Sequence, residues 1–386
     1  MTGWFWGVVS SRNHTFPYNL IKSIYKDAAH EEEEPHEESY IETNYESPKF
    51  IQHQIQNANN IYTFVKNNPI AFRNHLKNLI LLPKNITNII ELEENEFPKH
   101  QIRRRVPGNS KIFKATYYGI SHFGILEKSI DNIPTGIDKQ KKLLVYHQGH
   151  GANPYNSDSF LRLKEMFKEK NYDVLSLSMT GLCFNDRQKI WFPVSFTTPK
   201  KSIIYNFNPK MSHVHAIYRY FHDEQLPNIS PIALMLSGNY YIINHIIRQY
   251  DEVIMIGISG GGWYTSMLSS LIPEIQNSYS FAGSIPKAYR IDNSSIGDWE
   301  QTYASIWNDY DYWHFYLLSL FDELGDQKRN HYLIYNNEDP TSFSNPAAKN
   351  FNDLVGSLSI SGFKSSVLKN DEHVIDIGFV EDVILK

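Results

Sequence analysis

Residues 251–275, DEVIMIGISGGGWYTSMLSSLIPEI, join an apolar run to a cluster of glycines that holds one serine, Ser259. The apolar run predicts a buried strand, and the amphipathic stretch after the glycines predicts a helix. A sharp turn between such elements strains its apex residue and brings the residues two before and two after it against neighbouring strands. Only glycine fits there, and Gly257 and Gly261 hold those positions. The stretch therefore predicts a tight turn with Ser259 at its apex.

Ser259 in this turn is the candidate nucleophile. Its hydroxyl would stand above the sheet edge at a helix N-terminus, where the partial positive charge favours a developing anion. A serine needs a base, and the base needs an acid to orient it. Two later predicted strands end in such groups: Asp339 in NNEDP (336–340), with Glu338 as the rival acid, and His373 before the last predicted helix. The alternatives are an idle serine in a glycine-rich turn and a surface histidine in a loop.

The tetrahedral intermediate of acyl transfer requires N–H donors for its oxyanion. Gly260, the residue after the nucleophile, offers one backbone N–H. The second is expected from the loop after an early strand, in LLVYHQGHGANP (143–154), where Ala152 is the first choice and Gly151 the neighbouring one.

Together these motifs resemble the α/β-hydrolase superfamily over about residues 111–386. The matching segments are LLVYHQGHGA, YDVLSLSMTGLCFND, GISGG, NNEDP and the loop of His373, with serine, aspartate and histidine in the family's chain order. The resemblance implies a mostly parallel eight-stranded sheet flanked by helices, and serine hydrolase chemistry, most often on carboxylic esters. The sequence departs from the pattern in two ways. Ser178 stands where many members carry an aspartate, and the segment between Gly181 and Gly257 is longer than usual.

The residue patterns predict an α/β protein with two regions. Strands that are apolar throughout and alternate with helices indicate a mostly parallel sheet covered on both faces. Residues 1–105 are interpreted as an N-terminal extension, partly helical, with an acidic loop at EEEEPHEE (31–38). Residues 106–386 form the hydrolase-like domain, with aromatic-rich cap insertions around 186–230 and 287–325 that either line an acyl pocket or pack in the core.

The composition restricts which binding partners and which cellular compartment we expect for this protein. The 386 residues carry a formal net charge of −5 and give no indication of a nucleic-acid partner. The single cysteine, Cys183, excludes an intramolecular disulfide and is interpreted as a small buried filler. No apolar run approaches the roughly 18 residues that predict a membrane span. We expect a cytoplasmic protein; secretion would require the apolar start MTGWFWGVVSS to be the remnant of a signal peptide.

We expect neither a metal nor a cofactor. His147 and His150 lie three residues apart, but no third ligand accompanies them. A second group lies in SHVHAIYRYFHDE (212–224), where helical spacing does not place its three histidines on one face. His213, His215 and His222 are therefore interpreted as solvent or lid residues.

The sequence thus predicts a serine hydrolase that cleaves a small-molecule carboxylic ester through a Ser-His-Asp triad and an acyl-enzyme. Two alternatives stay open: a serine peptidase or amidase on the same triad, and a binding or scaffold module that has the hydrolase fold without catalysis. The identity of the substrate and the oligomeric state are not indicated.

Overall fold

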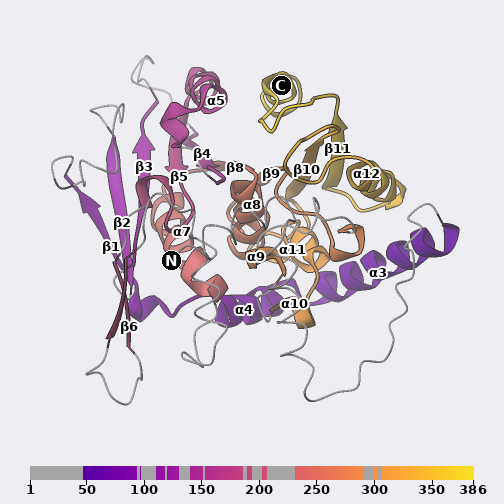
Figure 1. Ribbon diagram of the computed structural model, residues 1–386, viewed down its shortest axis with the longest axis horizontal. Coiled ribbons are helices and arrows are strands. Elements are labelled where there is room, and N and C mark those ends of the chain that lie inside the picture. Colours follow the sequence, from indigo (N-terminus) through magenta and orange to yellow (C-terminus); the bar gives the residue numbers. More distant parts are fainter. Residues whose placement is uncertain are drawn as a thin grey trace, which may run out of the picture.

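The architecture is given by a computed structural model (Figure 1). It describes residues 47–93, 96, 110–117, 120–129, 140–150, 153–185, 189–193, 202–206, 231–290, 299–302 and 306–386. Within these residues, nine strands form one sheet in the order β1-β2-β3-β5-β4-β8-β9-β10-β11, and β6 and β7 form a separate antiparallel pair.

The strands have the following bounds: β1 (Asn88–Leu92), β2 (Lys111–Tyr117), β3 (Ile120–Glu127), β4 (Lys142–His147), β5 (Tyr172–Leu177), β6 (Lys189–Pro193), β7 (Ser202–Asn206), β8 (Glu252–Ile258), β9 (Asn277–Phe281), β10 (Asn330–Asn336) and β11 (Phe363–Leu368). β1, β2, β3 and β5 pair antiparallel, whereas every pairing from β5 across to β11 is parallel. In the strand order of the sheet, β5 comes before β4, and a run of parallel strands follows. This arrangement is the α/β-hydrolase fold.

The sheet has one strand more than the eight that the resemblance implied. The additional strand, β1, lies in the N-terminal region and pairs with β2, in register from Asn88 with Thr116 to Leu92 with Ile112. Its side chains are mostly exposed, in contrast to those of β5 and β8, which are buried along almost their whole length. This contrast follows from position, since β1 is an edge strand and central parallel strands are covered on both faces.

The helices have the following bounds: α3 (Pro48–Asn67), α4 (Pro69–Ile80), α5 (Asp158–Glu169), α7 (Pro231–Ile247), α8 (Gly260–Leu271), α9 (Trp299–Thr302), α10 (Ile306–Asp309), α11 (Tyr312–Leu318), α12 (Ala347–Ser357), α13 (Ile377–Phe379) and the π-helix η6 (Val380–Ile384). Short 3₁₀ turns are η1 (Lys84–Ile86), η3 (Pro154–Asn156), η4 (Cys183–Asn185) and η5 (Lys287–Tyr289).

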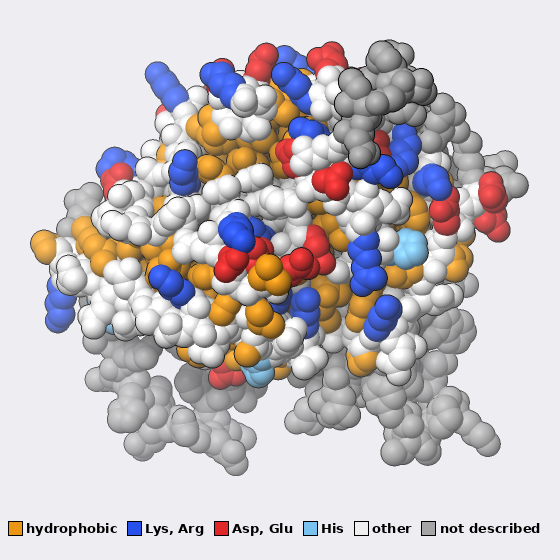
Figure 2. All heavy atoms as spheres, turned by 180° about the vertical axis from the view of Figure 1, so that it is seen from behind, with side chains coloured by type: hydrophobic (Ala, Val, Ile, Leu, Met, Phe, Trp, Pro, Cys, Tyr) orange, Lys and Arg blue, Asp and Glu red, His pale blue; other side chains and the backbone are white. Residues whose placement is uncertain are grey.

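Helices cover both faces of the sheet (Figure 1). α5 and the C-terminal helices pack on one face, and their apolar side chains share a core with β4, β5 and β8. α7, α8, α11 and α12 contribute to the core of the other face. Figure 2 shows Lys, Arg, Asp and Glu side chains interspersed over the rear of the molecule, with small groups of apolar side chains between them. Such mixing of charges produces no extended field of one sign over that view.

The N-terminal helices α3 and α4 belong to the same core as α8 and α11. Arg73 of α4 is buried, and its guanidinium donates to four main-chain carbonyls. Nε bonds Ser270 at 2.9 Å, Nη1 bonds Asp322 at 3.0 Å, and Nη2 bonds both Leu318, at 3.3 Å, and Phe321. Residues 47–81 are therefore attached to the end of α8 and to the segment after α11. The predicted boundary near residue 105 lies outside the described residues.

Among the described residues, no helix is both long and apolar enough to cross a membrane. These residues contain no group of three or more histidine, cysteine, aspartate or glutamate side chains arranged to hold a metal ion.

Candidate active site

Ser259 lies between the last residue of β8 and the first residue of α8, with φ of 57° and ψ of −128°. A residue other than glycine is strained in this region, typically by about 1–3 kcal/mol. Two hydrogen bonds hold it there: the Ser259 N–H donates to the Phe281 carbonyl at 2.8 Å, and the Trp263 N–H donates to the Ser259 carbonyl at 3.0 Å. The predicted strand–turn–helix is present, and its apex is fixed from both β9 and α8.

The glycines around Ser259 are required by close packing. A Cβ on Gly257 would lie 2.5 Å from Oγ1 of Thr265, and one on Gly261 would lie 2.7 Å from the carbonyl carbon of His147. Both distances are shorter than Cβ contacts in proteins, which confirms the prediction that only glycine fits at these two positions. A Cβ on Gly149 would lie 2.7 Å from the Cβ of Ser259, so the loop after β4 passes directly beside the serine.

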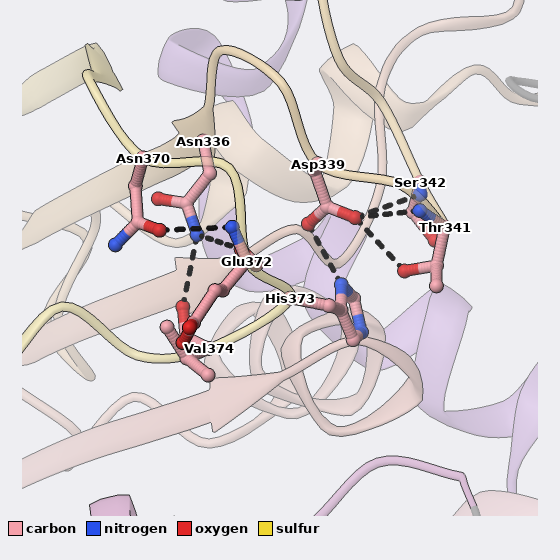
Figure 3. A network of polar contacts seen from close by, with 8 residues as sticks. All are labelled: Asn336, Asp339, Thr341, Ser342, Asn370, Glu372, His373 and Val374. Carbon is pink, nitrogen blue, oxygen red and sulfur yellow. Dashed lines mark hydrogen bonds and ion pairs between the residues drawn. The ribbon is translucent and has the colours of Figure 1, made fainter.

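Asp339 and His373 are brought together by the loops that follow β10 and β11 (Figure 3). His373 Nδ1 lies 2.7 Å from Asp339 Oδ2, and Asp339 Oδ1 accepts three hydrogen bonds, from the N–H and hydroxyl of Thr341 and the N–H of Ser342. The Asp339 side chain is fully buried, and that of His373 is 23% exposed. Glu338, the rival acid, is exposed. In this structure the partner of His373 is therefore Asp339.

The charge state of Asp339 follows from these contacts. Burial alone would raise the pKa of this carboxyl group, but the hydrogen bond and charge interaction with His373, together with the Thr341 donors, outweigh it and hold the pKa below its ordinary value. Asp339 is thus a carboxylate at neutral pH. It accepts a hydrogen bond from the N–H at Nδ1 of His373. In the neutral imidazole this leaves Nε2 as the nitrogen that carries no proton.

Asn336, the last residue of β10, holds the histidine loop in place (Figure 3). Its Nδ2 donates to the carbonyls of Glu372 at 2.8 Å and Val374 at 3.1 Å, on either side of His373. This residue was not predicted from the sequence. Its only signal was an asparagine at the end of a predicted strand, which does not reveal a partner in a loop 36 residues later.

The three predicted triad residues share one edge of the sheet. Ser259 follows β8, Asp339 follows β10 and His373 follows β11, and these strands run parallel through β9. The carboxyl ends of parallel strands meet at one edge, which is where ligands bind in open α/β sheets. The geometry that can be described fixes the Asp339–His373 pair and the backbone of Ser259; the catalytic roles stay predictions. Gly151 and Ala152, the expected loop donors for the oxyanion, lie outside the described residues.

The remaining candidates have structural partners or lie outside the described residues. His147 is buried, its Nε2 accepts from Nδ2 of Asn239 at 2.8 Å, its ring stacks on Tyr264, and burial lowers its pKa to about 3. These contacts hold it as a neutral core histidine. Cys183, predicted as a small buried filler, has φ of 53° and is partly buried, with its side chain packed against the core. Ser178 is buried, and its carbonyl accepts from Nδ2 of Asn185 at 2.9 Å. His213, His215 and His222 are among the residues that are not described.

In the second aromatic segment, 287–325, many aromatic side chains pack in the core. Among its described residues, seven aromatic side chains are buried in the core that includes α8: Tyr289, Trp307, Tyr312, Trp313, Phe315, Tyr316 and Phe321. Trp307 stacks on Tyr312 with ring centroids 4.3 Å apart, and Tyr312 accepts a hydrogen bond from Nε1 of Trp263 in α8. These residues pack the fold and are not part of an exposed lining. In the first segment, 186–230, only the backbone of β6 and β7 is described.

No family model matches the chain, and no curated protein sequence matches it. Solved structures with similar folds include acetyl xylan esterase 1 from Thermoanaerobacterium sp. JW/SL YS485, at 15% identity and a TM-score of 0.39, covering 84% of this chain and 92% of that one. Est1E from Butyrivibrio proteoclasticus has 11% identity and a TM-score of 0.36, over 68% of this chain and 90% of that one. Acylaminoacyl peptidase from Pyrococcus horikoshii has 13% identity and a TM-score of 0.41, over 71% of this chain and 38% of that one. At such values the similarity concerns the fold and assigns neither site residues nor substrate.

Proposed function

We propose that this α/β-hydrolase-fold chain is a serine hydrolase that cleaves a small carboxylic ester through an acyl-enzyme. The observation that carries the proposal is Ser259 at φ of 57° in a strand–helix turn whose flanking glycines, Gly257 and Gly261, admit no side chain. A strained backbone at a serine, maintained by packing from β4 and β9, is characteristic of a functional position. The buried Asp339 with His373 on the same sheet edge supplies the matching acid and base.

The mechanism follows from the protonation state of the pair. With Nδ1 of His373 donating to Asp339, Nε2 is the basic nitrogen and takes the proton of the Ser259 hydroxyl as Oγ attacks the ester carbonyl carbon. The carbonyl π electrons move to oxygen and form an oxyanion, to which the Gly260 N–H would donate. Collapse expels the alcohol, which takes the proton from Nε2 and leaves an acyl-serine. Water then repeats these steps, releasing the acid and restoring Ser259.

The first test is covalent labelling of the purified protein with a fluorophosphonate, with the modified residue identified by mass spectrometry. Labelling of wild type at Ser259 is expected. Ser259→Ala is expected to abolish labelling and to lower ester turnover by on the order of 10⁴- to 10⁶-fold. Ser357→Ala, at the end of the outer helix α12, is the matched control and should behave as wild type. Labelling that persists unchanged in Ser259→Ala would reject the assignment.

The second test addresses the class of substrate. An apolar acyl pocket gains about 0.8 kcal/mol for each buried methylene, so kcat/KM should rise a few-fold per carbon until the pocket is filled. We expect p-nitrophenyl esters of roughly C2 to C8 to be cleaved faster than long-chain lipids and aminoacyl amides. Faster cleavage of aminoacyl amides than of any ester would favour a peptidase with the same triad. Labelling without turnover of either class would favour a binding module.

A further inference from the structure

The short helix α9 brings a buried carboxylate close to the turn of Ser259. Two aromatic side chains fix its backbone. Nε1 of Trp307 donates to the carbonyl of Glu300 at 2.8 Å, and the hydroxyl of Tyr312 donates to the carbonyl of Gln301 at 3.4 Å. Tyr312 in turn accepts from Trp263 of α8, the helix that begins after Ser259. The position of Glu300 is therefore set relative to the same helix that carries the candidate active-site turn.

Glu300 faces His150, in the loop after β4. Its Oε1 lies 3.8 Å from Nε2 of His150, and the two side chains are 0% and 20% exposed. A carboxylate removed from water is costly unless a positive charge or hydrogen-bond donors compensate it. At 3.8 Å the two atoms are too far apart for a hydrogen bond, and the property of His150 that Glu300 can control is the orientation of the ring beside it.

The adjacent Nδ1–Cε1 edge of the His150 ring lies against Gly260. A Cβ on Gly260 would lie 2.8 Å from Cε1 and 2.9 Å from Nδ1 of His150, and would also overlap the sulfur of Met179. Gly260 is thus enclosed between an imidazole and a thioether. Its N–H is among the first of α8, which have no acceptor within the helix and are available to an anion.

We propose that Glu300 and His150 form a positioning pair that fixes the Gly260 N–H beside Ser259 for the developing oxyanion. Glu300 orients the His150 ring, and the ring limits the movement of the Gly260 backbone. Neither residue belongs to the predicted triad, and neither was identified in this role from the sequence. The inference rests on the proposed serine hydrolase function, since it concerns the donor for that reaction's intermediate.

The test uses Glu300→Gln, which keeps the shape of the side chain and removes its charge. Because the pair acts on a group needed mainly in the transition state, kcat should fall by about 10- to 100-fold while KM changes less than about twofold. The rate constant for fluorophosphonate labelling should fall by a similar factor. His150→Gln should give the same pattern. The double variant should lose little more than either single one, because the two residues act in series.

Glu127→Gln is the matched control, because Glu127 is also buried and charge-paired, with Lys164 and Lys168, but lies on β3. It should lower thermal stability and leave kcat and KM unchanged. Wild-type kcat in Glu300→Gln, or additive losses in the double variant, would overturn the positioning pair. If Glu300→Gln does not fold, His150→Gln decides alone, with unchanged kcat and labelling counting against the proposal. An unlabelled, inactive wild type would instead reject the serine hydrolase function.

Discussion

Two adjacent carboxylates after β10 have opposite environments. Asp339 is buried, bonded to His373 and supplied with three further donors, whereas Glu338 points to solvent. Asp339→Asn is expected to lower kcat/KM for an ester by about 10³- to 10⁴-fold, because an amide favours the wrong imidazole tautomer of His373. Glu338→Gln serves as the control and should change kcat/KM less than about twofold. A reversal of the two effects would make Glu338 the acid, and steady-state kinetics on both variants distinguishes the cases.

At the scale of elements, the turn after β8 depends on the absence of side chains. Gly261→Ala would place a Cβ 2.7 Å from the carbonyl carbon of His147 in β4 and even closer to the oxygen. Because backbone atoms cannot move aside cheaply, we expect this variant to lose at least about 3 kcal/mol of unfolding free energy. Activity should be lost with it.

Gly356→Ala provides a helical control for that substitution. A Cβ on Gly356 in α12 meets nothing within 4 Å, so the intrinsic preference of alanine for helices acts alone. This variant should gain about 0.5–1 kcal/mol. Urea unfolding of both variants checks the pair of values, and equal stabilities would contradict the packing argument.

The elements that could be predicted from the sequence are those with strong local signals. The apolar runs of β4, β5 and β8 and the glycines of the turn carry their own structural requirement, and the chain order placed Asp339 and His373 after the correct strands. β1 could not be predicted, because an edge strand with exposed side chains has no apolar pattern. The contacts of Asn336 and Glu300 also could not be predicted, because each depends on residues distant in the chain.

At the scale of the whole molecule, three fully buried histidines link stability to pH. Burial lowers the pKa of His122 to about 4 and those of His147 and His331 to about 3, against about 6.5 in an unfolded chain. Above pH 6.5 these groups are neutral in both states, and their contribution to stability is complete. As the pH falls from 6.5 towards 4, the unfolded chain binds protons that the fold excludes. Each such histidine then lowers the free energy of unfolding by about 1.4 kcal/mol per pH unit.

We therefore expect the unfolding free energy to fall steeply between pH 6.5 and 4, by up to roughly 4 kcal/mol per pH unit when all three histidines contribute. Urea titrations at half-unit intervals measure the slope. His331→Gln, which removes one of the three outside the candidate active site, should reduce that slope by about a third. A stability that does not change between pH 7 and 5 would contradict the prediction.

The four carbonyls that Arg73 binds are separated from it by 197 to 249 residues of chain. Ribosomes add about 5–20 residues per second, so these acceptors are synthesised roughly 10 to 50 seconds after α4. During that interval α3 and α4 lack their partners in α11 and α12, and the guanidinium must remain hydrated. Cotranslational chaperones and slower elongation should therefore influence the yield of folded protein mainly through residues 47–81, although the proposed chemistry resides more than 170 residues later.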